Sequence, residues 1–286
     1  MKLIKSKQFF IILFLLILLG FLDWQNNYIT ITNLEYKNHR IPKEFNNFKI
    51  LHISDLHNKE FGSSQKHLVN KTLEINPDVI FITGDIIDSR RTSEDELFIA
   101  KNYIEEATKI APVYYVSGNH ESRIGFYNKL KMELVNLGVH VLDNDSLNIT
   151  IGNDTIPIIG LSDITFTSSN YRNINIHKDI QDKLTALKVK NKANFSILLS
   201  HRPELISAYA ASNIDLVFSG HAHGGQIRIP FIGGLIAPDQ GLFPEYTEGI
   251  YEYDETSLVV SRGLGNSLFP FRIFNRPELV VVTLSK

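Results

Sequence analysis

Five short segments of this chain carry Asp, Asn and His side chains in an order that could bind metal ions. They are Asp55-Leu56-His57, Gly84-Asp85-Ile86-Ile87-Asp88, Gly118-Asn119-His120-Glu121, Ser200-His201 and Gly220-His221-Ala222-His223. Each follows a run of apolar, β-type residues. Because parallel strands end at one edge of a sheet, we expect the five segments to meet there. A mixed set of imidazole, carboxylate and amide donors suits Mn, Zn, Fe or Co better than Mg or Ca.

Two cations held at such an edge would suit the hydrolysis of a phosphoester. They lower the pKa of a bound water and neutralise charge on the attacking and leaving oxygens. Taken singly, the motifs are weak signals, because a D-x-H pair is usually a turn, Asp85 could be a cap and a lone His201 is usually a core residue. Together they place five of the ten histidines directly after strands, which chance rarely does.

The composition bounds the remaining possibilities. The chain has 286 residues, 43% of them hydrophobic, which is enough for one sizeable domain over residues 25–286. A formal net charge of -2 gives no bulk basic field, so we expect no nucleic acid partner. The chain has no cysteine, which excludes disulfides, thiolate nucleophiles, Cys-ligated zinc and a lipoprotein anchor.

Residues 1–24 differ from the rest and predict a membrane segment. Three lysines precede an unbroken apolar run from Phe9 to Leu22, which Asp23 and Trp24 close. The run covers about 21 Å at ~1.5 Å per residue, less than the ~30 Å hydrocarbon core, so by itself it resembles a signal peptide. The lysines can snorkel, Trp24 suits the interface and no small-x-small cleavage site follows. We therefore favour an uncleaved signal anchor over a cleaved signal peptide or a buried helix.

The positive flank of this segment also predicts its orientation. Lysine-rich flanks stay on the cytoplasmic side of a membrane. We therefore expect a single-pass protein of the cell membrane whose catalytic domain lies outside the cytoplasm.

Strand-type and helix-type stretches alternate along the rest of the chain. This pattern predicts an α/β fold with four layers, α/β/β/α, in which two mixed β-sheets are flanked by helices and preceded by the N-terminal membrane-anchor helix. The predicted strands are Phe48–Ser54, Asp78–Thr83, Val113–Val116, Phe195–Leu199, Asp215–Phe218, Ile250–Tyr253, Leu258–Ser261 and Glu278–Leu284. The predicted helices are Ser64–Ile75, Ser93–Lys109, Gly125–Leu137, Lys178–Val189 and Pro203–Ala210.

The motifs D-x-H, G-D-x-x-D, G-N-H-E, H and G-H-x-H, in this order, resemble those of the calcineurin-like metallophosphoesterase family. The resemblance runs from about residue 47 to the end of the chain. The segments GHAHGGQ at 220–226, SRGLG at 261–265 and RPE at 276–278 resemble the bacterial, membrane-attached members related to YkuE. No core motif position is missing, which speaks against a non-catalytic member of the family.

The resemblance implies a role for each motif residue. One divalent cation would be bound by Asp55, His57 and His223, and the other by Asn119, His201 and His221, with Asp85 bridging the two. A hydroxide held between the cations would attack phosphorus. His120 would protonate the leaving oxygen or stabilise the transition state, and Asp88 would orient its ring. From its place in the first turn after the motif, we expect Glu121 to be structural.

The substrate is less well defined by the sequence. Arg202 and Arg228 are candidates for binding phosphate oxygens, although an arginine in a loop is more often solvated. The apolar segments 230–244 and 268–274 favour a phospholipid or other lipid-linked phosphodiester, but they could equally close the core.

We therefore expect metal-dependent hydrolysis of a phosphoester, with a phosphodiester favoured, on the outer side of the membrane. One alternative is a lipid-linked pyrophosphatase acting on a nucleotide-sugar lipid, like a UDP-diacylglucosamine pyrophosphatase. A second is a non-catalytic adaptor or metal-binding protein on the same fold. The sequence leaves the metal pair and the oligomeric state open.

Overall fold

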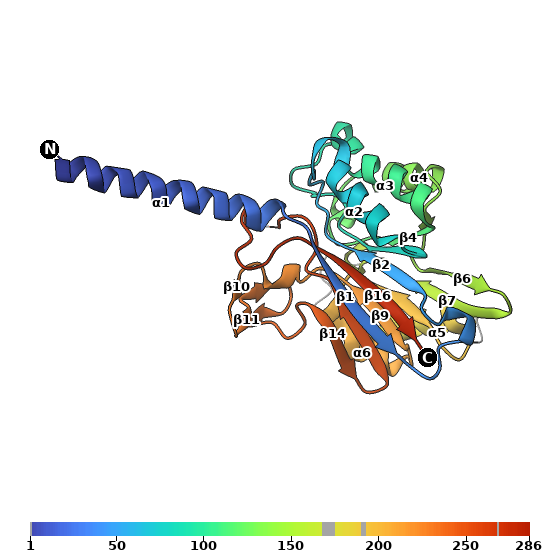
Figure 1. Ribbon diagram of the computed structural model, residues 1–286. Coiled ribbons are helices and arrows are strands. Elements are labelled where there is room, and N and C mark those ends of the chain that lie inside the picture. Colours follow the sequence, from blue (N-terminus) through green and yellow to red (C-terminus); the bar gives the residue numbers. More distant parts are fainter. Residues whose placement is uncertain (1, 168–174, 190–192, 268) are drawn as a thin grey trace.

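The arrangement of the chain is seen in a computed structural model that describes residues 2–167, 175–189, 193–267 and 269–286 (Figure 1). Among these residues, two six-stranded sheets pack face to face. Helices cover the outer face of each sheet, so the order of layers is helices, sheet, sheet, helices (Figure 1). The predicted α/β/β/α fold is confirmed.

The first sheet is mixed. Strands β2 to β5 are parallel, β16 runs antiparallel to β2, and β1 pairs in parallel with β16. The sheet is buried on both faces, which explains the continuous apolar runs of its central strands. In spatial order its strands are β1 (Thr30–Lys37), β16 (Glu278–Ser285), β2 (Lys49–Ile53), β3 (Val79–Thr83), β4 (Val113–Val116) and β5 (His140–Val141).

The second sheet has four parallel strands, β15, β9, β8 and β7, and an antiparallel strand at each edge. In spatial order its strands are β14 (Gly249–Tyr253), β15 (Thr256–Val260), β9 (Leu216–Ser219), β8 (Ile197–Leu199), β7 (Asp154–Gly160) and β6 (Asp145–Ile151). Two short hairpins lie outside both sheets. They are β10 (Arg228–Ile229) with β11 (Gly233–Gly234), and β12 (Ile236–Ala237) with β13 (Gly241–Leu242).

Alternate side chains of the strands supply three separate cores. In β3, Ile80 and Ile82 face the helices on the first sheet, while Phe81 faces the second sheet. The middle core holds Phe218 from β9 beside Phe81, with ring centroids 5.3 Å apart. Helices α2 (Lys66–Ile75), α3 (Phe98–Ile110) and α4 (Tyr127–Asn136) cover the first sheet, and α5 (Ile176–Val189) and α6 (Ile206–Ala211) cover the second.

Helix α1 (Lys2–Asn27) projects from the body and does not join any core (Figure 1). Its stretch Lys7–Asn27 is long and apolar enough to cross a membrane, and 21 residues span about 32 Å at ~1.5 Å per residue. The helix extends beyond the apolar run of 14 residues, because it continues through Trp24 to Asn27. Side chains from Phe9 to Leu19 are exposed, which excludes the alternative of a buried N-terminal helix.

Candidate functional site

Five loops converge where the parallel strands of the two sheets end. The loops after β2, β3 and β4 come from the first sheet, and those after β8 and β9 come from the second. Every predicted metal ligand lies on one of these loops and is buried. The first sheet supplies Asp55, His57, Asp85 and Asn119, and the second supplies His201, His221 and His223.

The backbone at these ligands is unusual. Five of them have a positive φ, which for residues other than glycine costs on the order of 1–3 kcal/mol each and is typical of functional sites. The five are Asp55 (52°), His57 (49°), Asp85 (51°), His221 (64°) and His223 (48°). Two of these residues are also linked directly, because the backbone N–H of His221 donates to Asp55 Oδ2 over 3.0 Å.

Glycines in the motifs allow the loops to approach one another. A Cβ at Gly118 would lie 2.3 Å from Asp85 Oδ1, and a Cβ at Gly220 would lie 1.8 Å from Ser54 Oγ. Any larger residue at these two positions would push the ligand loops apart.

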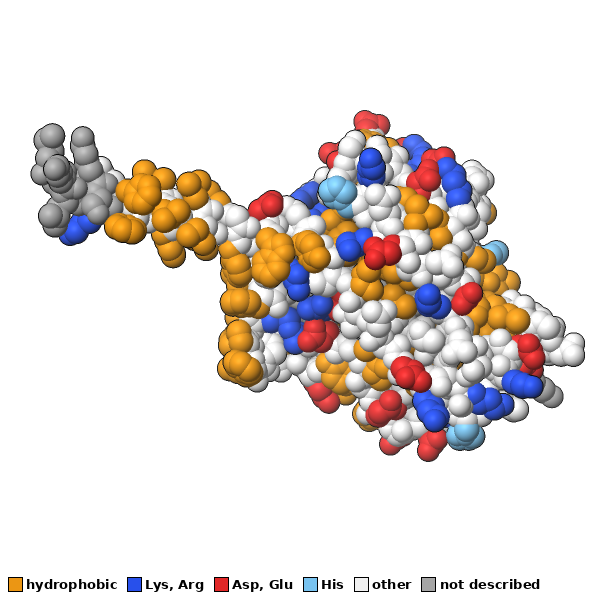
Figure 2. Space-filling model, viewed as in Figure 1, with side chains coloured by type: hydrophobic (Ala, Val, Ile, Leu, Met, Phe, Trp, Pro, Cys, Tyr) orange, Lys and Arg blue, Asp and Glu red, His pale blue; other side chains and the backbone are white. Residues whose placement is uncertain are grey.

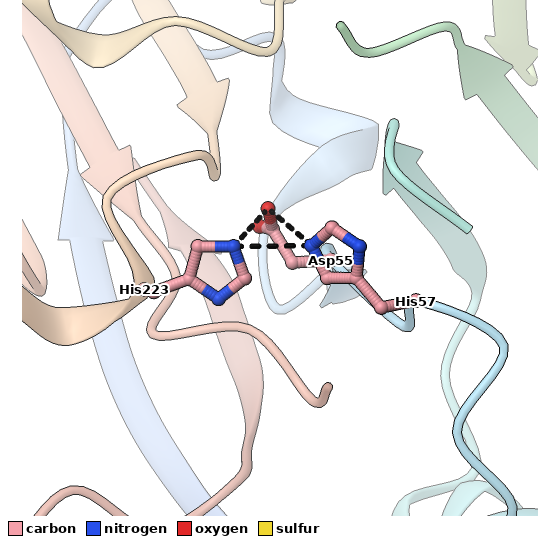
Figure 3. A group of neighbouring side chains, drawn as sticks. All are labelled: Asp55, His57 and His223. Atoms are coloured by element: carbon pink, nitrogen blue, oxygen red, sulfur yellow. Dashed lines mark hydrogen bonds and ion pairs between the residues drawn. The ribbon is translucent and has the colours of Figure 1, made fainter. Parts of the chain in front are cut away.

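Asp55, His57 and His223 form the first half of the site (Figure 3). The two Nε2 atoms of His57 and His223 lie 3.1 Å apart, and Asp55 Oδ1 lies 3.2 Å from His223 Nε2 and 3.8 Å from His57 Nε2. Asp55 Oδ1 is buried and, within the described part of the chain, has no hydrogen-bond partner. Two imidazole nitrogens and a carboxylate oxygen aimed at one point fit a divalent transition metal ion.

Asp85, His201 and His221 form the second half, and we expect Asn119, on the loop after β4, to join them. His201 Nε2 lies 3.2 Å from Asp85 Oδ2 and 3.1 Å from His221 Nδ1. Asn119 Oδ1 is buried without a hydrogen-bond partner among the residues described. Asp85 Oδ2 also lies 3.8 Å from His57 Nε2 in the first half, so one carboxylate reaches both sets of ligands. The residues present fit two cations that share Asp85.

The rings of the second half are fixed by further hydrogen bonds. His201 Nδ1 donates to the carbonyl of Thr83 over 2.7 Å, which leaves Nε2 facing Asp85. His221 Nε2 lies 3.3 Å from Asp239 Oδ2, which leaves Nδ1 facing His201. In the first half, the Nδ1 atoms of His57 and His223 have no such partner among the described residues. The second half is thus the more firmly preorganised.

Charge favours cation binding at this edge. Burial opposes ionisation of Asp85, but His201 and His120 hold its pKa well below the usual range. Burial lowers the pKa of His201, but Asp85 more than offsets this and raises it to about 10. Burial keeps the pKa of His223 well below its usual value, so that imidazole is neutral. Protons and cations therefore compete for the space between these ligands.

His120 lies beside the ligands. Its Nε2 is 3.9 Å from Asp85 Oδ2, and its Nδ1 is 3.3 Å from Asp88 Oδ1, so the predicted pair is brought together. The N–H of Ser89 also points to Nδ1, at 2.9 Å. Asp88 is held in turn by Arg90, with Nε and Oδ1 3.1 Å apart.

Glu121 links the loop after β3 to the loop after β4 through hydrogen bonds to their backbone. Its Oε2 accepts hydrogen bonds from the N–H groups of Asp85 (2.8 Å) and Gly118 (2.7 Å), and its Oε1 accepts one from Ile86 (2.8 Å). Burial and the nearby Asp85 raise its pKa to about 7. Its contacts are those of the structural support that we predicted.

The two predicted substrate-binding arginines are engaged with the protein's own acids. Arg202 is buried, with Nε 2.7 Å from Asp163 Oδ2 and Nη1 2.6 Å from Asp239 Oδ2. Arg228 forms an ion pair with Glu248 and donates to the carbonyl of Gly224 over 3.1 Å. In these positions Arg202 fixes Asp239 and Arg228 braces the loop after His223, while their contact with substrate remains a prediction.

Sequence reasoning missed Asp239. It belongs to no motif and lies in an otherwise apolar loop, with Ala237 and Pro238 before it. An isolated carboxylate in such a loop was the only available signal. Its role could be inferred only from the fold, which places its carboxylate beside His221 and Arg202.

The chain is similar in sequence to known proteins. The family model for calcineurin-like phosphoesterases matches residues 48–225. A Bacillus subtilis protein named uncharacterized metallophosphoesterase YkuE is 31% identical over 261 residues, covering 90% of this chain and 85% of that protein. The phosphodiesterase YaeI of Escherichia coli is 27% identical over 241 residues, covering 83% and 82%. A Bos taurus transmembrane protein with metallophosphoesterase domain is 28% identical over 266 residues, covering 89% and 56%.

Proposed function

Because the chain belongs to the calcineurin-like phosphoesterases, which are metal-dependent hydrolases of phosphoester bonds, we propose that it hydrolyses a phosphodiester with two divalent cations. The observation that carries this proposal is the position of Asp85. Its Oδ2 faces His201 Nε2 at 3.2 Å and His57 Nε2 at 3.8 Å, so the two sets of ligands share one carboxylate.

Asp55, His57 and His223 would hold one cation, and Asn119, His201 and His221 the other. When bound, the cations lower the pKa of a water and neutralise charge on the phosphoryl oxygens. The metals are Mn, Zn, Fe or Co, because each set of ligands includes two imidazole nitrogens, whereas Mg and Ca prefer ligands that are all oxygen.

His120 acts on the leaving group. Its Nε2 lies on the side that faces Asp85, 3.9 Å from Oδ2. With both ring nitrogens protonated, His120 can pass the Nε2 proton to the leaving oxygen as the ester bond breaks, which leaves a neutral imidazole. Asp88 stabilises the charged ring before that transfer, since its Oδ1 lies 3.3 Å from Nδ1.

Helix α1 anchors the catalytic domain, residues 25–286, in the cell membrane, with the domain outside the cytoplasm. The length and exposure of α1 support the anchor, and the name of the bovine relative agrees with membrane attachment. Lysines before the apolar run support the orientation. Protease added to intact cells should degrade the domain. A domain protected until the cells are lysed would contradict this topology.

Hydrolysis of bis-p-nitrophenyl phosphate by the detergent-solubilised full chain tests the activity. Mn, Zn, Co, Fe and Mg are added in turn, and Asp85→Asn is the control. We expect turnover that depends on metal and is lost in the control. A protein that binds two metal ions and hydrolyses no phosphodiester would favour the non-catalytic alternative.

A further inference from the structure

Large apolar side chains are exposed along one side of the body. They belong to the hairpin region 231–243 and to the loop 269–274, and Figure 2 shows them as a border that runs from the base of α1 along the side where β10 and β11 lie. We call this set the apolar rim. It consists of Phe231 (109% exposed), Ile232, Leu242, Phe243, Phe269, Phe271 and Phe274.

The rim does not close the core. Phe231, Phe243 and Phe274 have φ values of 68°, 51° and 51°, a conformation that bulky residues rarely adopt. Here the strained backbone presents aromatic rings to solvent, so burial inside the domain does not compensate for it. An exposed apolar border of this kind marks a surface that contacts another apolar phase.

The end of α1 is fixed to this same surface. The rings of Phe21 and Phe274 lie 5.6 Å apart in an edge-to-face contact. Asn26 Oδ1 accepts the N–H of Arg272 over 2.9 Å, and the guanidinium of Arg276 lies 4.6 Å from the centre of the Trp24 ring. The rim therefore begins at the point where α1 meets the body.

We infer that the apolar rim rests on the phospholipid bilayer that α1 crosses. This inference depends on the membrane anchoring proposed above. Trp24 is exposed at the body end of α1, where aromatic rings favour the boundary between lipid and water. A bilayer at that level meets the side of the body that carries the rim, and its Phe, Ile and Leu side chains enter the interfacial layer.

An apolar groove lies beside the rim. It has a volume of about 460 Å³ and lies between the two rim segments, lined by Gln226, Ile227, Leu235, Ile236, Ala237, Pro238, Ser267 and Phe269.

Three groups that line or adjoin this groove are bonded to residues of the site. Pro238 precedes Asp239, which contacts His221. Asn275 Nδ2 donates to the carbonyls of both Gln226 (2.9 Å) and His223 (2.7 Å). The carbonyl of Ser267 accepts from Arg91, whose Nε lies 3.5 Å from Asp88 Oδ2. The metal site is thereby held beside the bilayer, and a phosphoester whose acyl chain stays in the lipid can reach it.

The lack of cysteine makes the bilayer contact directly measurable. Phe231→Cys and Phe243→Cys are each labelled with bimane in the otherwise unchanged full chain, in nanodiscs of phosphatidylcholine and phosphatidylglycerol that carry nitroxide on the lipid. Leu73→Cys on α2 and Met132→Cys on α4 are matched controls, since these side chains are 55% and 61% exposed. We expect severalfold stronger quenching at 231 and 243 than at 73 and 132. Equal quenching would overturn the inference.

A pair of substrates tests the consequence for catalysis. Both release p-nitrophenol, but bis-p-nitrophenyl phosphate is soluble while a phosphatidyl-p-nitrophenyl ester sits in phosphatidylcholine vesicles. We expect Phe231→Ser with Phe243→Ser to lower turnover of the vesicle substrate about tenfold or more, since burying one Phe in lipid is worth at least that factor. Turnover of the soluble diester should change less than about twofold, as expected for surface residues.

The controls separate this inference from the proposed activity. Leu73→Ser with Met132→Ser removes two exposed apolar side chains from the helices α2 and α4, outside the rim. This variant should turn over both substrates at the rate of the unchanged protein. An equal loss on both substrates in the rim variant would contradict a bilayer contact. Failure of the unchanged protein on the soluble diester would instead contradict the proposed activity, while quenching at 231 and 243 would still decide whether the rim meets the membrane.

Discussion

The metal site and the apolar rim depart in opposite ways from the usual rule that apolar side chains are buried and charged ones exposed. At the site, carboxylates and imidazoles are buried, and Asp55 Oδ1 and Asn119 Oδ1 lack hydrogen-bond partners among the described residues. At the rim, Phe231 and Phe243 are exposed although they are large and apolar. Both regions also hold residues other than glycine at positive φ. Each arrangement costs stability unless a second component is present, a cation in one case and a lipid surface in the other.

The difference between the regions lies in how strictly each needs its residues. A metal site depends on particular atoms at particular distances, so single substitutions should have large effects. A surface that contacts lipid depends on total apolar area, so a single substitution should remove only part of the contact. The following experiments test this contrast.

Asp85→Asn should have the largest effect. The carboxylate that serves both sets of ligands would lose its charge, so activity should fall by more than the ~100-fold seen when outer partners of a metal are removed. Bound metal should fall from two ions to one or none, as measured by mass spectrometry of the metals. Two retained ions with normal turnover would contradict a shared carboxylate.

His120→Ala should reduce kcat by about 10²–10⁴-fold, the range for loss of a general acid. The metal content should stay at the level of the unchanged protein, because we assign His120 to the leaving group. Loss of metal would instead make His120 a ligand. A substrate with a good leaving group, such as p-nitrophenol, should be less affected than an alkyl diester, which depends more on protonation.

Asp239→Ala should weaken metal binding by about 10–100-fold, as for other residues that orient a ligand. The expected cause is a less ordered His221 ring, whose Nε2 lies 3.3 Å from Asp239 Oδ2. Chelator competition measures the affinity. Glu105→Ala on α3 removes an exposed carboxylate far from the site and should leave it unchanged, so equal effects of the two variants would rule out a positioning role for Asp239.

Phe231→Ala should have the smallest effect, changing the free energy of unfolding in detergent by no more than about 0.5 kcal/mol. Phe218→Ala is the matched comparison from the core between the sheets, where removal of a buried ring should cost about 3–5 kcal/mol. Denaturant titration measures both. A large loss with Phe231→Ala would mean that the rim supports the fold.

Most of the layered architecture could be predicted because its strands are local apolar runs. Val113–Val116 matched to the residue, and the helices α2 and α4 lie within their predicted ranges. β1 was not predicted as a strand, because TITNLEYK is only partly apolar and its partner β16 is far along the chain. The four two-residue strands of the hairpins β10 to β13 are too short to give a periodic signal.

The same division holds at the site. Motif residues could be placed together because each directly follows a strand, and strand ends meet by topology. The contacts of Arg202 with Asp163 and Asp239 could not be predicted, since they join three separate loops. The rim was visible in the sequence only as apolar segments. Its exposure and its position beside α1 depend on how the hairpins fold back.

The strand order of the first sheet also determines when the domain can fold. β16 lies between β1 and β2 and pairs with both, so the sheet stays open until residues 278–285 have been synthesised. Until then β2, and with it the loop that carries Asp55 and His57, lacks its neighbour. With the topology proposed here, the polypeptide would still be unfolded while it crosses the membrane behind α1. The metal ions would then be acquired after export, from the compartment in which the finished enzyme works.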